Sequence, residues 1–432
     1  MNRRLFFPVG PLLLVTLACA LGPVTATPDG ATPGAADAVS TQVAVELTAA
    51  SLGTATPPET TAPQASPAPA LTGSIRLVYS QGGNIFVWDG LGSKQLSSSG
   101  KDSSPCISAD GAVVAFMRAG ELWAVEAGGS GERILVAAAA LTTNAGPREP
   151  RRFAFAPHSH ELYFNTVLTD NPFPVPQEDL WKVDADHPTV QPLLSAKQGG
   201  ADFVFSSDGA KIALPRADKI NIVNADGSGL TTVFSFTPVK MYSEASYTPQ
   251  IVWLPDASGF KTVIPAADAL AEPAALSRFM FVPADGSRAA QLAEFVSAPA
   301  AADPPRISPD GSRVFYARPR GGELELHIID ASTADQNFFS YDADKIGILD
   351  WAPDSLHVLY WQEDTRRAYL GAPNTQGTPL SDGANAEKVR WIDATQYLYL
   401  DGLDLRLRSL GQPSLLIAAS VAEGFDVVSL RP

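Results

Sequence analysis

The five histidines of the chain include one close pair, His158 and His160, and such a pair could contribute two ligands to a transition metal. A zinc site needs further ligands, and no cysteine or third histidine stands at ligand spacing. The pair falls where other copies of a repeated turn have Asp-Gly. We therefore interpret it as a turn variant and expect no metal site.

Other catalytic patterns are missing or incomplete in the sequence. Cys106 lies in an expected strand without a neighbouring His or Lys, so we expect a small buried side chain rather than a reactive thiol. The sequence contains no G-x-S-x-G elbow and no glycine-rich phosphate loop. The acid pairs Asp184/Asp186 and Asp342/Asp344 do not continue into a calcium-binding loop. We expect no catalytic residue and no cofactor.

Cys19 is the other residue with its own chemistry. It follows Thr16-Leu17-Ala18 at the end of an apolar run that begins at Leu5, behind two arginines, and that is too short to span a bilayer. This stretch resembles a bacterial lipobox, in which the cysteine is lipidated and becomes the mature N-terminus. Thr16 departs from the usual aliphatic residue. The alternative is an ordinary signal peptide with an incidental cysteine.

The segment after Cys19 is a linker. Residues 20–73 are dominated by Ala, Thr, Pro, Ser and Gly and contain no aromatic residue, so they cannot bury enough surface to fold. We therefore divide the chain into a leader with its lipobox (residues 1–19), a linker (20–73) and a folded domain (74–432).

The folded domain contains a repeated phrase, in which an apolar strand is followed by a tight turn and a second apolar strand. Asp bonds its own backbone in such a turn and Gly accepts positive φ, so each copy is typical of a β-hairpin. Three copies are clear and four are weaker, and they run through Ile107–Phe116, Phe205–Leu214, Ile307–Tyr316, Phe155–Phe164, Trp253–Phe260, Trp351–Tyr360 and Trp391–Ala394.

Each hairpin is followed by further apolar segments, such as Ile220–Asn224 and Leu230–Phe236. Four strands per unit, at a spacing of forty to fifty residues, predict an all-β propeller. Three expected strands precede the first full unit, and they lack the first strand of a four-stranded blade. We expect Gly424–Leu430 to be that strand. The two ends would then share a blade and remove exposed sheet edges. We expect eight four-stranded blades, with seven as the alternative.

The small-Pro-Asp-Gly hairpins and the Asp226-Gly227-Ser228-Gly229 second turn resemble the TolB-type propeller repeat, a relative of the WD repeat. The resemblance covers roughly Ser74 to Pro432. It implies a propeller in the cell envelope that binds partners there. Fold membership alone does not settle function.

Charge narrows the class of partner. The formal net charge is −15 at pH 7, which disfavours nucleic acid and anionic lipid surfaces. We expect an exported protein that is anchored to a membrane only through its lipid, faces the periplasm or the exterior, and binds an envelope protein, peptide or glycan without catalysis. The alternatives are a glycan lyase or hydrolase with acids scattered round the central channel, and a purely structural role.

The long connections should lie together. In a four-strand meander, the connections between strands two and three and between blades leave the same face. The long segments Thr166–Gln177, Ala266–Ser277, Ala138–Glu149 and Thr237–Thr248 all belong to that set. Loops on a rigid scaffold often carry function. We expect this face to bind the partner, and the alternative is tolerated surface insertions. The candidate contact residues are Asn171, Phe173, Tyr242 and Tyr247.

Overall fold

The computed structural model describes residues 74–144, 146–170, 173–200, 202–330, 336–341, 346–362, 365–373, 375–380 and 386–430. These residues all belong to one compact unit. The leader, Cys19 and the linker lie outside the described residues, as does Asn171.

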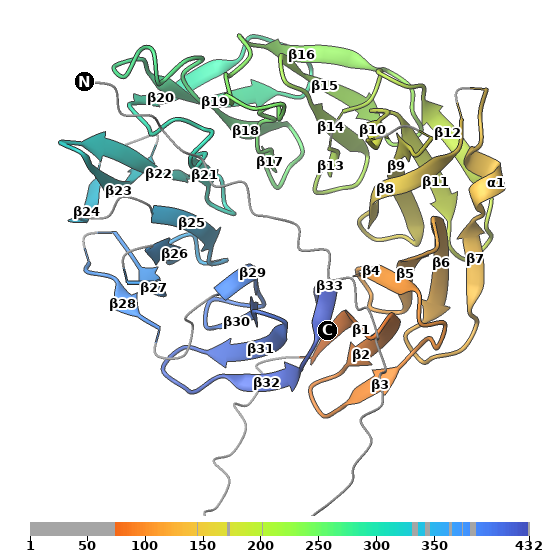
Figure 1. Cartoon of the computed structure of the whole chain (residues 1–432). Helices are drawn as coiled ribbons and strands as arrows, with labels where there is room; N and C mark the ends of the chain where they lie inside the picture. Colours follow the sequence, from red (N-terminus) through yellow and green to blue (C-terminus); the bar gives the residue numbers. More distant parts are fainter. Residues whose placement is uncertain are drawn as a thin grey trace, which may run out of the picture. The chain divides into compact units, whose positions relative to one another are not determined.

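The described chain forms eight antiparallel sheets arranged in a ring, which confirms the eight-bladed propeller (Figure 1). The sheets follow one another in chain order, and we number them as blades 1 to 8 and give the strands of each from the innermost outwards. The first four blades are β33 (Val421–Leu430), β1 (Ser74–Gln81), β2 (Asn84–Trp88) and β3 (Ser93–Gln95); β4 (Asp102–Ile107), β5 (Val113–Arg118), β6 (Glu121–Glu126) and β7 (Arg133–Val136); β8 (Arg148–Phe155), β9 (Glu161–Leu168), β11 (Leu180–Asp184) and β12 (Val190–Leu194); and β13 (Val204–Phe205), β14 (Lys211–Pro215), β15 (Lys219–Asn224) and β16 (Thr231–Ser235).

The second half of the ring has the same plan. Its four blades are β17 (Val252–Trp253), β18 (Gly259–Ile264), β19 (Ser277–Pro283) and β20 (Ala290–Phe295); β21 (Arg306–Ile307), β22 (Arg313–Arg320), β23 (Glu323–Asp330) and β24 (Gln336–Tyr341); β25 (Ile346–Trp351), β26 (Val358–Gln362), β27 (Arg367–Gly371) and β28 (Thr378–Pro379); and β29 (Ala386–Trp391), β30 (Gln396–Asp401), β31 (Asp404–Ser409) and β32 (Leu415–Ala418).

Two short elements stand outside this plan. The strand β10 (Val175–Pro176) pairs with β9 and makes blade 3 five-stranded, and α1 (Ala138–Leu141) is the one helix within the described residues. No described helix has the length and apolar character needed to cross a membrane.

The turns between the first and second strands of the clear copies have the predicted geometry. In the turn after β4, the Asp110 carboxylate accepts the backbone N–H of Ala112 at 3.0 Å, and Gly111 has φ of 71°. Asp208 and Asp310 accept the equivalent N–H groups at 3.0 and 2.8 Å. The Asp side chain therefore completes the turn, and Gly supplies the left-handed residue that it requires.

Hydrophobic side chains fill the spaces between the blades. Each blade is covered on both faces, so its middle strands read as nearly continuous apolar runs. In β5, for example, Val113 and Ala115 pack towards blade 3, whereas Val114 and Phe116 pack towards blade 1. Eight clusters of this kind lie between successive pairs of blades, the last of them between blades 8 and 1. The hydrophobic core therefore consists of separate clusters, one between each pair of neighbouring blades.

The two ends of the described chain close the ring in blade 1. The last strand, β33, pairs antiparallel with β1, with Ser74 opposite Leu430 and Tyr79 opposite Phe425. The Asp426 carboxylate also accepts the backbone N–H of Ile107 in blade 2 at 3.1 Å. The predicted shared blade is thus confirmed, and β33 forms part of the innermost ring of strands (Figure 1).

Candidate functional site: the long-loop face and the central channel

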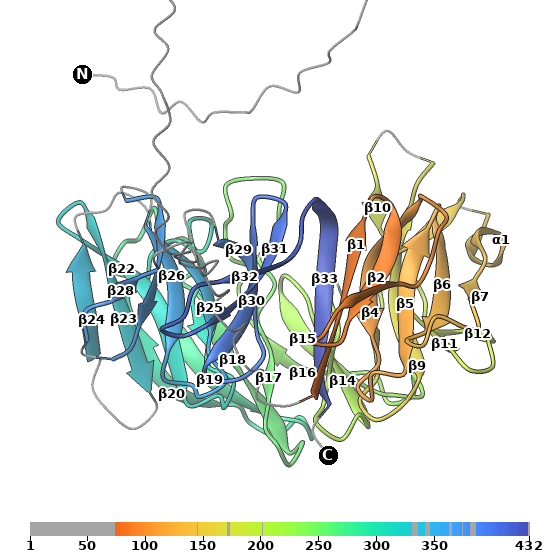
Figure 2. The same ribbon diagram turned by 90° about the horizontal axis from the view of Figure 1, so that it is seen from below.

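The long connections leave one face of the ring, which we call the long-loop face. They link β7 to β8, β9 to β11, β16 to β17 and β18 to β19. Figure 2 places β10, which belongs to the second of these, at the upper edge of the ring, whereas β33 runs down to the lower edge. The opposite face carries the Asp-Gly turns, and we call it the short-turn face.

Two of the long loops are joined by Asp268. Its carboxylate accepts hydrogen bonds from the Lys240 ammonium and the Tyr242 hydroxyl, and also the backbone N–H of Ala271 at 3.1 Å. The Lys240 N–H bonds to the carbonyl of Ala267 at 2.9 Å. The hydrogen bonds from Lys240 and Tyr242 lower the pKa of Asp268 to about 2, so it stays ionised. These contacts hold the two loops together as one surface.

The candidate contact residues have different environments. Phe173 is 81% exposed and Tyr242 is 56% exposed. Tyr247, which we expected to be exposed, is only 7% exposed and donates its hydroxyl to the carbonyl of Val263 at 3.0 Å. It packs with Val239 and other apolar side chains beneath the loops. Tyr247 therefore supports the loop from below and offers no exposed ring.

A cavity of about 690 Å³, which we call the mouth cavity, lies between two long loops. Pro176 and Glu178 line it from the blade 3 loop, and Ala245, Ser246 and Thr248 line it from the loop before β17. Arg151, Arg152 and Asp202 also line it, close to the innermost strands. The mouth cavity thus connects the long-loop face with the channel wall.

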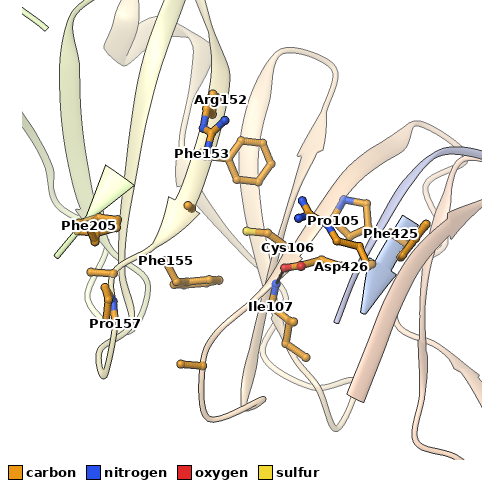
Figure 3. Close-up of a pocket in the computed structure, with 14 residues that line it drawn as sticks. Pro105, Cys106, Ile107, Arg152, Phe153, Phe155, Pro157, Phe205, Phe425 and Asp426 are labelled. Atoms are coloured by element: carbon orange, nitrogen blue, oxygen red, sulfur yellow. Dashed lines mark hydrogen bonds between the residues drawn. The ribbon is translucent and has the colours of Figure 1, made fainter. Parts of the chain in front are cut away.

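A second cavity of about 600 Å³, the channel cavity, shares Arg152 with the mouth cavity. Its wall comes from the innermost strands and the turns that follow them. Figure 3 shows phenylalanines of β8 and β13 on one side and Cys106 with residues of β33 on the other. The residues that line it are Pro105, Cys106, Ile107, Ala109, Arg152, Phe153, Ala154, Phe155, Ala156, Pro157, Phe205, Arg390, Phe425 and Asp426.

β-Bulges decide which side chains reach the channel. In β8, Pro150 lies opposite Thr166 and Arg152 opposite Asn165, so Arg151 is an extra residue. An extra residue shifts the alternation of side chains, and Arg151 and Arg152 both line the mouth cavity. The register of β29 shifts in the same way, and Lys388 and Arg390 both line a cavity there. None of these three arginines and this lysine was among the candidate residues named from the sequence.

Carboxyl and amide groups tie the innermost strands of neighbouring blades together. Besides Asp426, the Asp303 carboxylate accepts the N–H of Ile348 at 2.7 Å, and the Gln250 amide oxygen accepts that of Ile307 at 2.9 Å. Burial raises the pKa of Asp303 to about 7, although the hydrogen bond from Ile348 opposes this effect. Burial also raises the pKa of Asp426. These groups have a structural role at the channel wall.

Cys106 and His160 have structural roles too. Burial and the nearby Asp426 carboxylate raise the pKa of the Cys106 thiol, so it stays protonated and is a weak nucleophile. His160 bonds to Asp186 at 2.9 Å and to Asp110 of blade 2 at 3.0 Å. No cluster of three or more His, Cys, Asp or Glu side chains in the described part of the chain could hold a metal ion.

Comparison with known proteins supports the fold. No family model matches the sequence, and no curated protein matches it. A crystal structure of the eukaryotic initiation factor is similar with a TM-score of 0.52 at 10% identity, covering 81% of this chain and 85% of that one. An oligogalacturonate lyase from Vibrio parahaemolyticus gives 0.44 at 12% identity, covering 65% and 80%. TolB from Acinetobacter baumannii gives 0.32 at 14% identity, covering 60% and 61%.

Proposed function

We propose that this protein is an exported binding module of the TolB type, anchored by a lipid on Cys19, whose long-loop face recognises a protein, peptide or glycan of the cell envelope. The observation that carries the proposal is the hydrogen bonding of Asp268, which joins two long loops into one surface. This surface exposes Tyr242 and is held by the ring of blades. Preorganised loops lose little conformational entropy on binding, and exposed aromatic rings are effective anchors.

Several exposed apolar side chains stand on the long-loop face. Tyr242 is accompanied by Leu270 and Leu276, which are 58% and 45% exposed on the partner loop, and Phe173 stands on the blade 3 loop. Large apolar side chains on loops cost solubility unless a partner covers them. The Pro-Asp-Gly and Asp-Gly-Ser-Gly turns support the TolB-type assignment.

Photo-crosslinking in the native envelope tests the proposed face. A photoreactive amino acid is placed at Phe173 or Tyr242, and at Leu91 as a matched control. Leu91 is 97% exposed in the turn between β2 and β3, on the short-turn face. We expect one discrete adduct from the first two positions and none from Leu91. The same adduct from all three positions, or none from any, would contradict the proposal.

A loop replacement gives a second test. Exchanging residues 171–175 for a short Gly-Ser turn should abolish the adduct formed from Tyr242 while leaving the thermal unfolding of the ring unchanged. An undiminished adduct would show that the blade 3 loop takes no part in binding. Screening the chain against wall glycans addresses catalysis, because turnover of any glycan would replace the proposed binding role with an enzymatic one.

The lipid anchor is tested separately. We expect the chain to incorporate labelled palmitate when it is produced with its leader, and the Cys19→Ala variant to lose the label and leave the membrane fraction. Equal labelling of both forms would refute lipidation at Cys19.

A further inference from the structure

Positive side chains gather on the channel wall of a protein whose net charge is −15. Arg151 and Arg152 line the mouth cavity, Arg152 and Arg390 line the channel cavity, and Lys388 lines the cavity next to it together with Arg390. All four are exposed. They come from two innermost strands, β8 and β29. In β8 a bulge allows the adjacent Arg151 and Arg152 to line the same cavity, and in β29 Lys388 and Arg390 stand two residues apart and also share a cavity.

The acids of the same cavities already have partners. Glu178 pairs with Arg216 at 2.7 Å, and Asp202 pairs with Arg152 at 2.6 Å. Asp426 accepts two backbone N–H groups, from Ile107 at 3.1 Å and from Val427 at 2.9 Å.

Arg390 differs from the other arginines of the channel. It forms no ion pair or hydrogen bond with any residue that the structure describes. Burial raises the pKa values of Asp350 and Asp426, and the nearby charge of Arg390 opposes this rise. Its guanidinium therefore keeps its donors for a ligand. The side chain of Arg152 is 49% exposed despite its pairing with Asp202, so it also can offer donors to the cavity.

The remaining wall of the channel cavity is aromatic. Phe153, Phe155, Phe205 and Phe425 line it and are only partly buried, so portions of their rings stay accessible (Figure 3). A volume of about 600 Å³ accommodates a small molecule. Aromatic rings favour a flat apolar group, and guanidinium groups favour carboxylate or phosphate because their geometry allows paired hydrogen bonds.

We propose that the channel cavity binds a ligand that carries an oxyanion, either phosphate or carboxylate, beside a flat ring, with Arg390 and Arg152 holding the anion and the phenylalanines holding the ring. This site lies on the channel wall and is additional to the partner surface proposed for the long-loop face.

Ala109 offers a reporter position, because it lines the same cavity and is exposed, and Cys19 and Cys106 are the only cysteines of the chain. In the full chain carrying Cys19→Ala, Cys106→Ser and Ala109→Cys, a neutral methanethiosulfonate reagent modifies the introduced thiol, and a bound ligand slows the modification. The probes are phenyl phosphate and benzoate, with phenol as the neutral control. We expect saturable protection by at least one of the two anions at millimolar concentration and at least fivefold weaker protection by phenol. Comparing the two anions distinguishes phosphate from carboxylate.

Substitutions then assign the arginines. Arg390→Gln should raise the concentration for half-protection at least fivefold, and Arg390→Lys should restore part of the loss. The matched control is Arg133→Gln. Arg133 lies on β7, the outermost strand of blade 2, and pairs with Glu126 at 2.9 Å, so this variant should need the same ligand concentration for half-protection as the parent. Thermal unfolding verifies that each variant is folded. Equal protection by phenol, absence of protection, or indifference to Arg390→Gln would each overturn the proposal.

Discussion

Asp303 should make the stability of the ring depend on pH in a direction that is unusual for an aspartate. Its carboxyl group precedes β21 and accepts the N–H of Ile348 in the next blade. Burial raises its pKa to about 7 from the ordinary value of 3.8, and this outweighs the opposing effects of the hydrogen bond and of Arg306. The unfolded chain therefore releases this proton at lower pH than the folded chain.

The sign and size follow from linkage. A group whose pKa is raised by folding contributes stability that is fully present below its unfolded pKa and is lost as pH rises through its folded pKa. Each tenfold change in the proton affinity of a group corresponds to about 1.4 kcal/mol, so a rise in the pKa of Asp303 from 3.8 to about 7 amounts to about 4 kcal/mol in total. About 2.5 kcal/mol of this stability is lost between about pH 5 and about pH 8.

Denaturant unfolding of the parent and of Asp303→Asn at these two pH values measures the effect. Asparagine keeps an oxygen that can accept the Ile348 N–H but cannot ionise. The stability of the variant relative to the parent should rise by about 2.5 kcal/mol between the lower and the higher pH. Asp285→Asn serves as control, because Asp285 lies in an exposed turn where a hydrogen bond from Ser287 lowers its pKa, and its difference should stay flat over this range. Parallel pH profiles for Asp303→Asn and the parent would refute the reasoning.

Three further predictions concern stability. For His160, burial lowers the pKa but hydrogen bonds to two aspartates raise it more, so His160→Gln should cost stability at pH 5.5 and progressively less as pH rises through the folded pKa, as measured by thermal unfolding. Asp102→Ala should lower the free energy of unfolding in denaturant by about 1.5 to 3 kcal/mol, because Arg118 loses its buried partner 2.6 Å away and keeps only its ion pair with Glu132. Ala257→Gly should add about 0.5 to 1 kcal/mol by removing the strain of a φ of 55° at a turn position where other copies have glycine, which a raised unfolding midpoint would show.

The propeller could be predicted because its signals are local and repeated. An Asp-Gly turn such as Asp310-Gly311 dictates a hairpin wherever it occurs, and apolar runs on either side identify blades that are buried on both faces. The number of blades could also be predicted from the sequence. Three expected strands at the start of the folded domain lacked a first strand, and a single strand at its end lacked three partners, so together they make an eighth blade.

The channel could not be predicted because its composition depends on register. Arg151 and Arg152 both line the mouth cavity because a bulge in β8 leaves Arg151 without a partner residue on β9, and no sequence signal marks this place. Tyr247 illustrates a second limit. An aromatic residue in a long loop is typical of a contact surface. The ring of Tyr247 instead packs into an apolar cluster beneath the loop.

Ring closure by β33 has a consequence for how the protein is made. The partner strand β1 is among the first parts of the folded domain to be synthesised, whereas β33 is the last. Until β33 has been synthesised, blade 1 lacks its innermost strand and the apolar space between blades 8 and 1 stays open to solvent. Contacts between such distant positions form slowly, and unpaired edges promote aggregation. An incomplete ring is therefore expected to be more prone to aggregation than one in which the ten-residue strand β33 has paired with β1.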